Sequence, residues 1–397
     1  MGIEIAWQEW LGMLIRWLHV VAGIAWIGTS FYFIWLDQSL RQPKELPKKV
    51  HGESWSVHGG GFYHVQKYLV APDRIPPELH WFKYEAYFTW ISGFALLAVL
   101  YYWGAESFLI DPDRAALSPT VAVLTSLGFL IGGWLAYDLL CRSAIGRHTG
   151  VLATAVFILV VLIGWGLTQV FNDRAAFLHV GAVIGTIMSA NVFFVIIPNQ
   201  KKVIADLQAG RVPKANLGQQ AKDRSLHNNY LTLPVVLLMV SFHYPVLFGG
   251  GAERGWVVIA LILLIGGIVR NFFNKQHADA SRWSLLWQWP LATLLAIALI
   301  LLLSPQRSGS NLIVSDQQVL TIVADHCLSC HATKPTNPAF QAPPGGVYFD
   351  SLKDLEKYGA RILVQAVMSQ AMPLGNTTNM TEEERNALGA WIRSTHK

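Results

Sequence analysis

Charged side chains are scarce in this chain. Lys, Arg, Asp and Glu account for 14% of its 397 residues, whereas 53% are hydrophobic. Because soluble globular domains carry roughly 25% charged residues, this composition excludes an ordinary soluble protein and indicates a chain that lies largely in a membrane. The formal net charge of +5 arises mostly from basic loops between apolar segments, so it does not indicate a nucleic acid as partner.

Cysteine is also scarce, and the three that occur leave no pair for a structural disulfide. Two of them lie in the segment Cys327-Leu328-Ser329-Cys330-His331. This C-x-x-C-H pattern attaches a c-type haem: the two thiols form thioethers with the haem vinyl groups, and His331 lies beneath the iron as its proximal ligand. The remaining Cys141 is interpreted as a small buried apolar side chain. The pattern predicts that the chain carries electrons.

Eight apolar stretches are long enough to cross a hydrocarbon core of roughly 30 Å. They lie near residues 11–37, 84–104, 119–141, 151–171, 175–198, 229–248, 255–274 and 284–304. We therefore predict an all-α fold with a bundle of eight transmembrane helices. Lys and Arg are concentrated in the first, third, fifth and seventh loops, whereas the other loops hold only Arg114, Arg174 and Arg254. Since cytoplasmic loops retain basic residues, both termini are predicted outside, where c-type haem is attached.

A polar linker at 306–311 divides the chain into a membrane domain, 1–305, and a C-terminal domain, 312–397. Ser315 with Gln318 and Thr381 with Glu384 have the spacing of capping boxes that open helices, and a further helix is predicted at about 352–369. Three helices around a haem predict a small cytochrome c fold, in which the cofactor completes a core too small to stand alone.

The second iron ligand is predicted to be Met372. A ligand must project from a loop opposite the haem motif, and the following Pro373 holds such a loop rigid. A methionine ligand raises the redox potential of the haem. Met368 lies within a predicted helix and is interpreted as core, whereas Met380 precedes the last helix. His326 is interpreted as a surface residue.

The membrane domain resembles a parallel duplication of four helices. Leu18-His19-Val20 recurs as Leu178-His179-Val180, and Leu130-Ile131-Gly132-Gly133 recurs as Leu264-Ile265-Gly266-Gly267. Repeats of four helices keep their orientation, so an axis along the membrane normal would relate them. The small residues in these segments are interpreted as points of close helix packing: Gly128, Gly132, Gly133, Gly266 and Gly267.

Ionisable residues inside a membrane are costly and mark functional sites. His19 and His179 occur at matching depth in the two repeats, so they are candidate ligands of a b-type haem. The alternative is that each histidine makes one interhelical hydrogen bond. His243, Glu85 and Asp138 are further candidates for a role inside the bundle.

The first cytoplasmic loop concentrates polar and aromatic side chains. His64, His80 and Glu85 can deprotonate a ligand, Lys67 and Lys83 can hold an anion, and nearby aromatic faces suit a planar ring. The run Gly59-Gly60-Gly61 lets backbone amides approach a ligand. For any single residue the alternative is structural, such as interfacial anchoring. Further residues could line the same pocket: Asn228, Asn229, Tyr230 and Thr232.

Four segments, together with the terminal haem motif, resemble the bacterial membrane-bound urate oxidases, or urate hydroxylases, that are fused to cytochrome c. They are Leu18-His19-Val20, His58-Gly59-Gly60-Gly61-Phe62-Tyr63-His64, His80-Trp81-Phe82-Lys83-Tyr84-Glu85-Ala86-Tyr87 and His227-Asn228-Asn229-Tyr230. The resemblance spans essentially the whole chain. It implies oxidation of urate to 5-hydroxyisourate, with His64, His80 or Glu85 as base and Lys67 and Lys83 holding the urate anion.

The resemblance also implies where the electrons go and where the protein lies. Electrons would pass to the c-type haem and on to a respiratory-chain acceptor, such as a cytochrome c or a terminal oxidase. The protein would be a multi-pass protein of the bacterial inner membrane, with its N-terminus and cytochrome c domain in the periplasm. Two alternatives come from other classes: a quinol or cytochrome electron relay without urate chemistry, and a transporter with a regulatory cytochrome.

Overall fold

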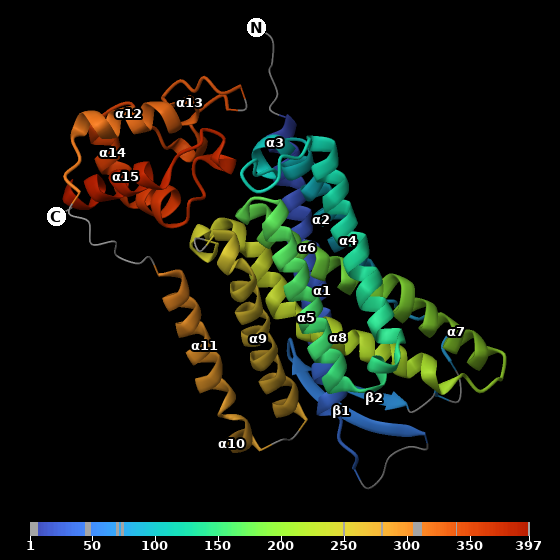
Figure 1. Cartoon of the computed structure of the whole chain (residues 1–397). Helices are drawn as coiled ribbons and strands as arrows, with labels where there is room; N and C mark the ends of the chain where they lie inside the picture. The colour runs from blue at the N-terminus through green and yellow to red at the C-terminus, as the bar shows by residue number, and fades with distance from the viewer. Residues whose placement is uncertain are drawn as a thin grey trace.

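The chain folds into a helical bundle and a smaller C-terminal helical unit (Figure 1). The computed structural model describes residues 7–43, 49–68, 71–72, 75–248, 251–278, 281–304, 312–338 and 340–395. The predicted linker, 306–311, lies outside the described residues. The start of α1 and the C-terminal unit lie at the same end of the bundle (Figure 1), which an even number of membrane crossings requires.

The bundle is built from long apolar helices. It comprises α1 (Trp7–Ser39), α2 (Tyr84–Leu97), α3 (Ala105–Phe108), α4 (Pro119–Arg142), α5 (Thr149–Val170), α6 (Asp173–Ala190), α7 (Ile197–Gln208), α8 (Ala215–Val240), α9 (Gly251–His277), α10 (Arg282–Leu285) and α11 (Gln288–Leu303). Two π-helical turns interrupt it: η1 (Ala98–Tyr102) continues α2, and η3 (Asn191–Ile196) joins α6 to α7.

Six described segments are long and apolar enough to cross a membrane. They are α1, α4, α5, the continuous α6–η3–α7, α9 from Glu253, and the α10–α11 segment from Trp283. The two other predicted spans differ in physical ways. The regular helix α2 has only 14 residues before its π turn, and the first half of α8 carries charged residues such as Lys222 and Asp223. The count of eight crossings stays a prediction.

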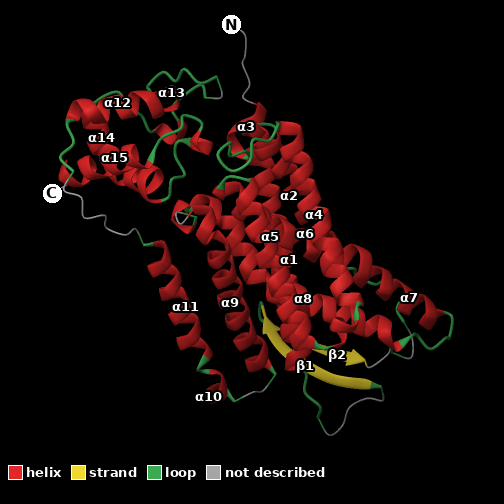
Figure 2. Ribbon diagram, in the orientation of Figure 1, coloured by secondary structure: helices red, strands yellow, loops and turns green. Residues whose placement is uncertain are grey.

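One part of the predicted all-α fold is wrong. Strand β1 (Val50–His58) pairs antiparallel with β2 (Gly61–Tyr68), so that His58 lies opposite Gly61. Gly59 and Gly60 have φ angles of +58° and +79°, which a two-residue hairpin turn of type I′ requires and which glycine adopts at low cost. The glycine run therefore forms a hairpin turn, and its contact with a ligand stays a prediction. The hairpin lies at the bundle end opposite the C-terminal unit (Figure 2).

The packing of the bundle agrees with a four-helix duplication. Helix α1 packs against α2 as α6 packs against α8, and α4 packs against α5 as α9 packs against α11. The core of the bundle forms around α6, whose Phe177, Ile184 and Ile187 are fully buried. These contacts are consistent with two repeats of four helices, and the duplication stays a prediction.

Two of the five glycines interpreted as packing points do lie at close helix contacts. A Cβ on Gly133 would lie 2.6 Å from Cγ1 of Val183 on α6, and a Cβ on Gly266 would lie 2.6 Å from Cδ of Pro234 on α8. The interpretation is wrong for Gly128, Gly132 and Gly267, because a Cβ there meets nothing within 4 Å. These three leave room for a side chain.

The C-terminal unit has its own hydrophobic core. It comprises α12 (Asp316–His326), α13 (Leu328–His331), α14 (Leu352–Ile362), continued by the π turn η7 (Leu363–Met368), the short turns η6 (Pro344–Gly346) and η8 (Leu374–Asn376), and α15 (Glu382–Thr395). Val319, Leu355 and Leu388 are fully buried in this core, and Trp391 Nε1 donates to Asp316 Oδ1 at 2.7 Å. The core shares no buried residue with that of the bundle.

Helix caps in this unit follow the predicted spacing. The Thr381 N–H donates to Glu384 Oε2 at 2.8 Å and the Glu384 N–H to Thr381 Oγ1 at 3.3 Å, which confirms the capping box. The N-cap at Ser315 is confirmed by a bond from the Gln318 N–H. His326 is not a surface residue, because its side chain is 7% exposed and contacts both Thr378 and Glu384.

The two units touch at the end of the bundle. Turn η8 contacts α3, and η7 contacts a 3-10 turn of the bundle, Pro245–Leu247. Ala371 packs against the core of the bundle, and a Cβ on Gly375 would lie 3.4 Å from the carbonyl oxygens of Ser107 and Ile110. The loop that contains Met372 is therefore the segment that meets the bundle.

Candidate functional site

The hairpin residues His64 and Lys67 both contact neighbouring side chains. His64 Nε2 lies 2.8 Å from Glu53 Oε2, and its ring stacks on Trp55 with centroids 4.1 Å apart. Lys67 forms an ion pair with Asp37 of α1. Asp37 also binds Lys222 Nζ of α8 at 3.2 Å, so this carboxylate ties the hairpin to two helices. Burial, and to a lesser degree Lys222, lowers the pKa of Lys67.

The other three predicted catalytic residues lie around the start of α2. His80 contacts Phe82 edge to face at 4.5 Å, and Lys83 Nζ lies 4.8 Å from the ring centroid of Tyr84. Glu85 is in the first turn of α2. Within the described part of the chain, no hydrogen bond or ion pair joins any two of the five predicted catalytic residues. Their joint role in catalysis stays a prediction.

The haem motif has a geometry that suits a c-type haem. His331, at the end of α13, has Nδ1 2.8 Å from the carbonyl oxygen of Val347. A carbonyl only accepts, so Nδ1 carries the proton and Nε2 is left for iron, the arrangement in which ligating histidines are oriented by a second bond. Burial raises the pKa of the Cys327 thiol to about 12. Because redox-active C-x-x-C pairs need a lowered thiol pKa, this favours haem attachment over dithiol chemistry.

Met372 is well placed among the three candidate methionines. Its N–H donates to the carbonyl oxygen of Gln365 at 2.9 Å, and its own carbonyl accepts from Arg385 at 2.6 Å. Its side chain packs against the same core as Cys327. Met380 is 3% exposed and belongs to that core, and Met368 ends the π turn η7. The donor set of two thiols, a free imidazole nitrogen and a thioether fits a c-type haem.

The membrane histidines do not form a prepared ligand pair. His179 is fully buried, with Nε2 2.8 Å from Ser126 Oγ on α4 and Nδ1 2.7 Å from the Ala175 carbonyl oxygen. His19 Nδ1 lies 2.9 Å from the Thr89 carbonyl oxygen on α2. Since both ring nitrogens of His179 are engaged, these residues do not fit a b-type haem as they lie, and each makes the interhelical contact given as the alternative.

A buried polar network joins α4, η3 and α8. Arg224 donates to Asp138 Oδ1 at 2.7 Å and to Asn191 Oδ1 at 2.9 Å, and Asn191 Nδ2 donates to the Tyr137 hydroxyl at 3.0 Å. His227 Nδ1 lies 2.8 Å from the same hydroxyl. Of this network, the sequence analysis singled out only Asp138 as an ionisable candidate. Within this network the Asp138 carboxylate pairs with the Arg224 guanidinium, so each charge is compensated.

A second polar cluster lies on the other side of α8. Arg270 of α9 is 5% exposed, donates from Nε to Asn229 Oδ1 at 2.9 Å and lies 3.9 Å from the ring centroid of Phe31. Asn274 Nδ2 donates to the same Asn229 oxygen at 2.9 Å. The sequence analysis named Asn229 but missed Arg270, although an arginine inside the apolar stretch 255–274 is a signal of function.

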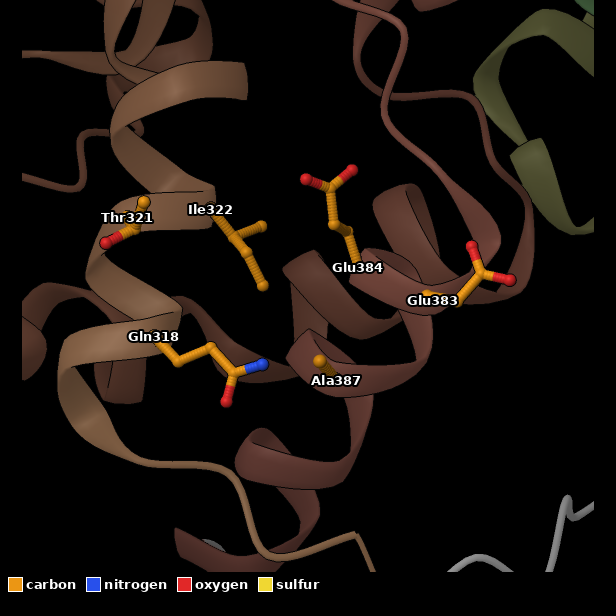
Figure 3. Close-up of a pocket in the computed structure, with 6 residues that line it drawn as sticks. All are labelled: Gln318, Thr321, Ile322, Glu383, Glu384 and Ala387. Atoms are coloured by element: carbon orange, nitrogen blue, oxygen red, sulfur yellow. The ribbon is translucent and has the colours of Figure 1, made fainter.

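A hollow of about 320 Å³ lies on the C-terminal unit between α12 and α15 (Figure 3). Its lining comprises Gln318, Thr321, Ile322, Glu383, Glu384 and Ala387. Figure 3 shows the two carboxylates pointing apart, and Glu384 already contacts His326 at 3.2 Å. The lining contains none of the predicted site residues, so we assign no chemistry to this hollow.

Comparison with known proteins gives one match. No curated protein and no solved structure matches the chain significantly. A family model described as Urate oxidase N-terminal matches residues 5–303, which include the whole bundle and the hairpin and end before the C-terminal unit. Because the match covers most of the chain, the protein belongs to this urate oxidase N-terminal family and is related to enzymes that oxidise urate.

Proposed function

We propose that this protein oxidises urate to 5-hydroxyisourate and passes the electrons to a c-type haem in its C-terminal unit. One observation carries the proposal: a bundle that belongs to the urate oxidase N-terminal family continues, in the same chain, into a C-x-x-C-H motif whose His331 keeps Nε2 free. A substrate domain and an electron-accepting domain are thereby joined in one molecule.

The reaction balances without molecular oxygen. Urate and water give 5-hydroxyisourate, two protons and two electrons, because loss of two electrons and two protons leaves an electrophilic ring that water attacks at C5. A base must take the protons, and His64, His80 and Glu85 are the candidates. Lys67 is already paired with Asp37, so Lys83 is the freer of the two lysines proposed to hold the urate anion.

The C-terminal unit would supply the electron acceptor. Cys327 and Cys330 would hold the haem covalently, and His331 and Met372 would bind its iron. The bound haem would supply one-electron chemistry, so each turnover would need two electron transfers. The Val347 carbonyl oxygen fixes the His331 ring, and Arg385 holds the backbone of the Met372 loop.

The proposal includes a location and a final acceptor. Six apolar segments suit a multi-pass membrane protein, and we propose the bacterial inner membrane, with the C-terminal unit in the periplasm. This orientation places the haem on the side where respiratory-chain acceptors such as a cytochrome c or a terminal oxidase can receive electrons. The basic loops at the hairpin end support it, since such loops stay in the cytoplasm.

Urate-dependent reduction of the haem tests the proposal. Oxidised full-length protein, purified in detergent and kept anaerobic, is mixed with urate while the haem spectrum is recorded. We expect full reduction with one 5-hydroxyisourate formed per two haems reduced. A haem that dithionite or a quinol reduces but urate does not would refute urate chemistry and favour a simple electron relay.

A further inference from the structure

Among the described residues, Arg270 is a buried cation without a counter-charge. Arg270 is only 5% exposed. In the described part of the chain, no carboxylate lies within ion-pair distance of its guanidinium. Arg224, at a similar burial on α8, pairs with Asp138 at 2.7 Å. A buried charge that lacks its partner is strongly destabilising, so an unpaired guanidinium at this depth calls for an anion from outside the chain.

Unsatisfied polar atoms lie on α9 and on the helices that pack against it. The described residues contain eight buried side-chain nitrogen or oxygen atoms that lack a hydrogen-bond partner, and five of them lie on the helices that surround Arg270. These five atoms are Gln38 Oε1, Asn229 Nδ2, Asn274 Oδ1, His277 Nδ1 and Gln288 Nε2. Each such atom has given up its hydrogen bonds to water without a replacement, which is destabilising. We call these five residues and Arg270 the Arg270 cluster.

The helix geometry brings the cluster together. Residues 270, 274 and 277 share one face of α9, because they are spaced by four and three positions. Gln38 lies seven residues from Phe31, on the same face of α1, and the Phe31 ring contacts Arg270. Asn271 Nδ2 donates to Gln288 Oε1 at 3.2 Å, which ties the start of α11 to α9. Helices α1, α8 and α11 all pack against α9.

The hydrogen-bonding roles of the free atoms are fixed by their neighbours. Asn229 Oδ1 accepts from both Arg270 Nε and Asn274 Nδ2, so Asn229 is left with a donor and Asn274 with an acceptor. Gln288 uses its oxygen toward Asn271 and is left with a donor, Nε2. A ligand must therefore carry negative charge, accept several hydrogen bonds and also donate some. A fully deprotonated inorganic anion, such as chloride or sulfate, only accepts.

We infer that the Arg270 cluster binds a planar anionic oxopurine, which on the proposed function is the urate monoanion. Urate has three carbonyl oxygens, which accept from Arg270, Asn229 and Gln288, and ring N–H groups, which donate to Asn274 and Gln38. The site thus lies inside the bundle at its hairpin end, since Gln38 is near the end of α1 and Gln288 begins α11. The hairpin residues His64 and Lys67 lie at the same end of the bundle.

Equilibrium binding separates this inference from turnover. Full-length protein is purified in detergent, its haem is reduced beforehand with dithionite so that urate is not consumed, and binding of radiolabelled urate is measured without oxygen. Arg270→Met should weaken binding at least about tenfold, because a hydrogen bond to a charged group contributes about 1.5–3 kcal/mol and 1.4 kcal/mol is tenfold in affinity. Arg254→Met is the matched control, since Arg254 lies on the same helix but is exposed, and it donates to the Leu302 carbonyl oxygen.

A second variant guards against loss of fold. Asn274→Asp places a carboxylate beside Arg270, so the buried guanidinium gains a partner within the chain while the site loses its affinity for an anion. We expect this variant to be as monodisperse as wild type and to bind urate at least about tenfold more weakly. Urate binding in Asn274→Asp equal to that of wild type overturns the inference.

The inference and the proposed function fail in different ways. If wild-type protein binds urate through Arg270 but urate never reduces the oxidised haem, the binding site stands and the proposed function falls. If urate reduces the haem with the same KM in wild type and Asn274→Asp, urate oxidation stands and the Arg270 cluster is not its binding site.

Discussion

Replacing Gly266 by alanine should disturb the bundle in a way that the neighbouring Gly267→Ala does not. The added methyl at Gly266 would lie 2.6 Å from Cδ and 2.7 Å from Cγ of Pro234. Carbon atoms in contact prefer about 3.5–4.0 Å, so α8 and α9 must separate by roughly 1 Å. The proline ring has no rotamer that avoids the methyl, and such overpacking costs about 1–3 kcal/mol.

Comparing the two variants isolates the free-energy cost of overpacking at Gly266. Both gain about 1 kcal/mol of helix propensity from the change of glycine to alanine, and a Cβ on Gly267 meets nothing within 4 Å. The difference in unfolding free energy between them should therefore equal the overpacking cost. It can be measured by titrating the protein with SDS in mixed micelles and following tryptophan fluorescence. Equal midpoints for the two variants would refute the close contact between α8 and α9.

Four further outcomes are expected. Met372→Ala should keep the haem covalently attached but lose the weak charge-transfer band of a methionine–iron bond; an unchanged band would move the ligand to another methionine. The Thr381 N–H, and His326 to a lesser degree, hold the pKa of Glu384 below its usual value, so its contribution to stability is present above about pH 4.3 and is lost as the pH falls through the lowered pKa. Glu384→Gln should therefore flatten the acid unfolding of the C-terminal unit, recorded from the haem spectrum of the full chain, and an unaltered acid limb would contradict this. Replacing His64, His80 or Glu85 by glutamine, one at a time, should lower urate turnover without altering the haem spectrum. Wild-type turnover in all three variants would exclude these residues as bases. Since both ring nitrogens of His179 are engaged, acid–acetone should extract no non-covalent haem from the purified protein; an extractable haem would contradict this and support the b-type haem predicted from the sequence.

The sequence predicted those features that depend on local spacing. The apolar runs predicted the long helices, and the Thr381 and Glu384 spacing predicted a capping box, whereas the role of His331 as an iron ligand stays a prediction from the C-x-x-C-H motif. The hairpin was missed because the strands are polar and aromatic and the glycine run was interpreted as a ligand-binding loop. Its turn could have been predicted, since two adjacent glycines between strand-forming segments favour type I′ geometry.

The buried polar sites depend on contacts between distant segments. Arg224 and Asp138 are 86 residues apart, and Arg270 and Asn229 are 41 residues apart, so no local pattern pairs them. The principle that ionisable residues inside a membrane are functional could have singled out Arg270, but only the packing of α1, α8, α9 and α11 shows that no carboxylate of the described residues pairs with it. The predicted pairing of His19 with His179 was weak for the same reason, because matching depth does not establish which helix each ring faces.

The contact between Gly375 and the bundle also affects the kinetics of electron transfer. Because the loop that carries Met372 rests on α3 and the adjoining residues, the proposed electron donor and acceptor belong to one molecule and keep a fixed separation. A donor and acceptor held together act at an effective concentration that mixing two free proteins does not provide. Transfer into the haem is then first order, and its rate does not change when the protein is diluted. Only the later step, in which electrons leave for a separate acceptor, slows with dilution.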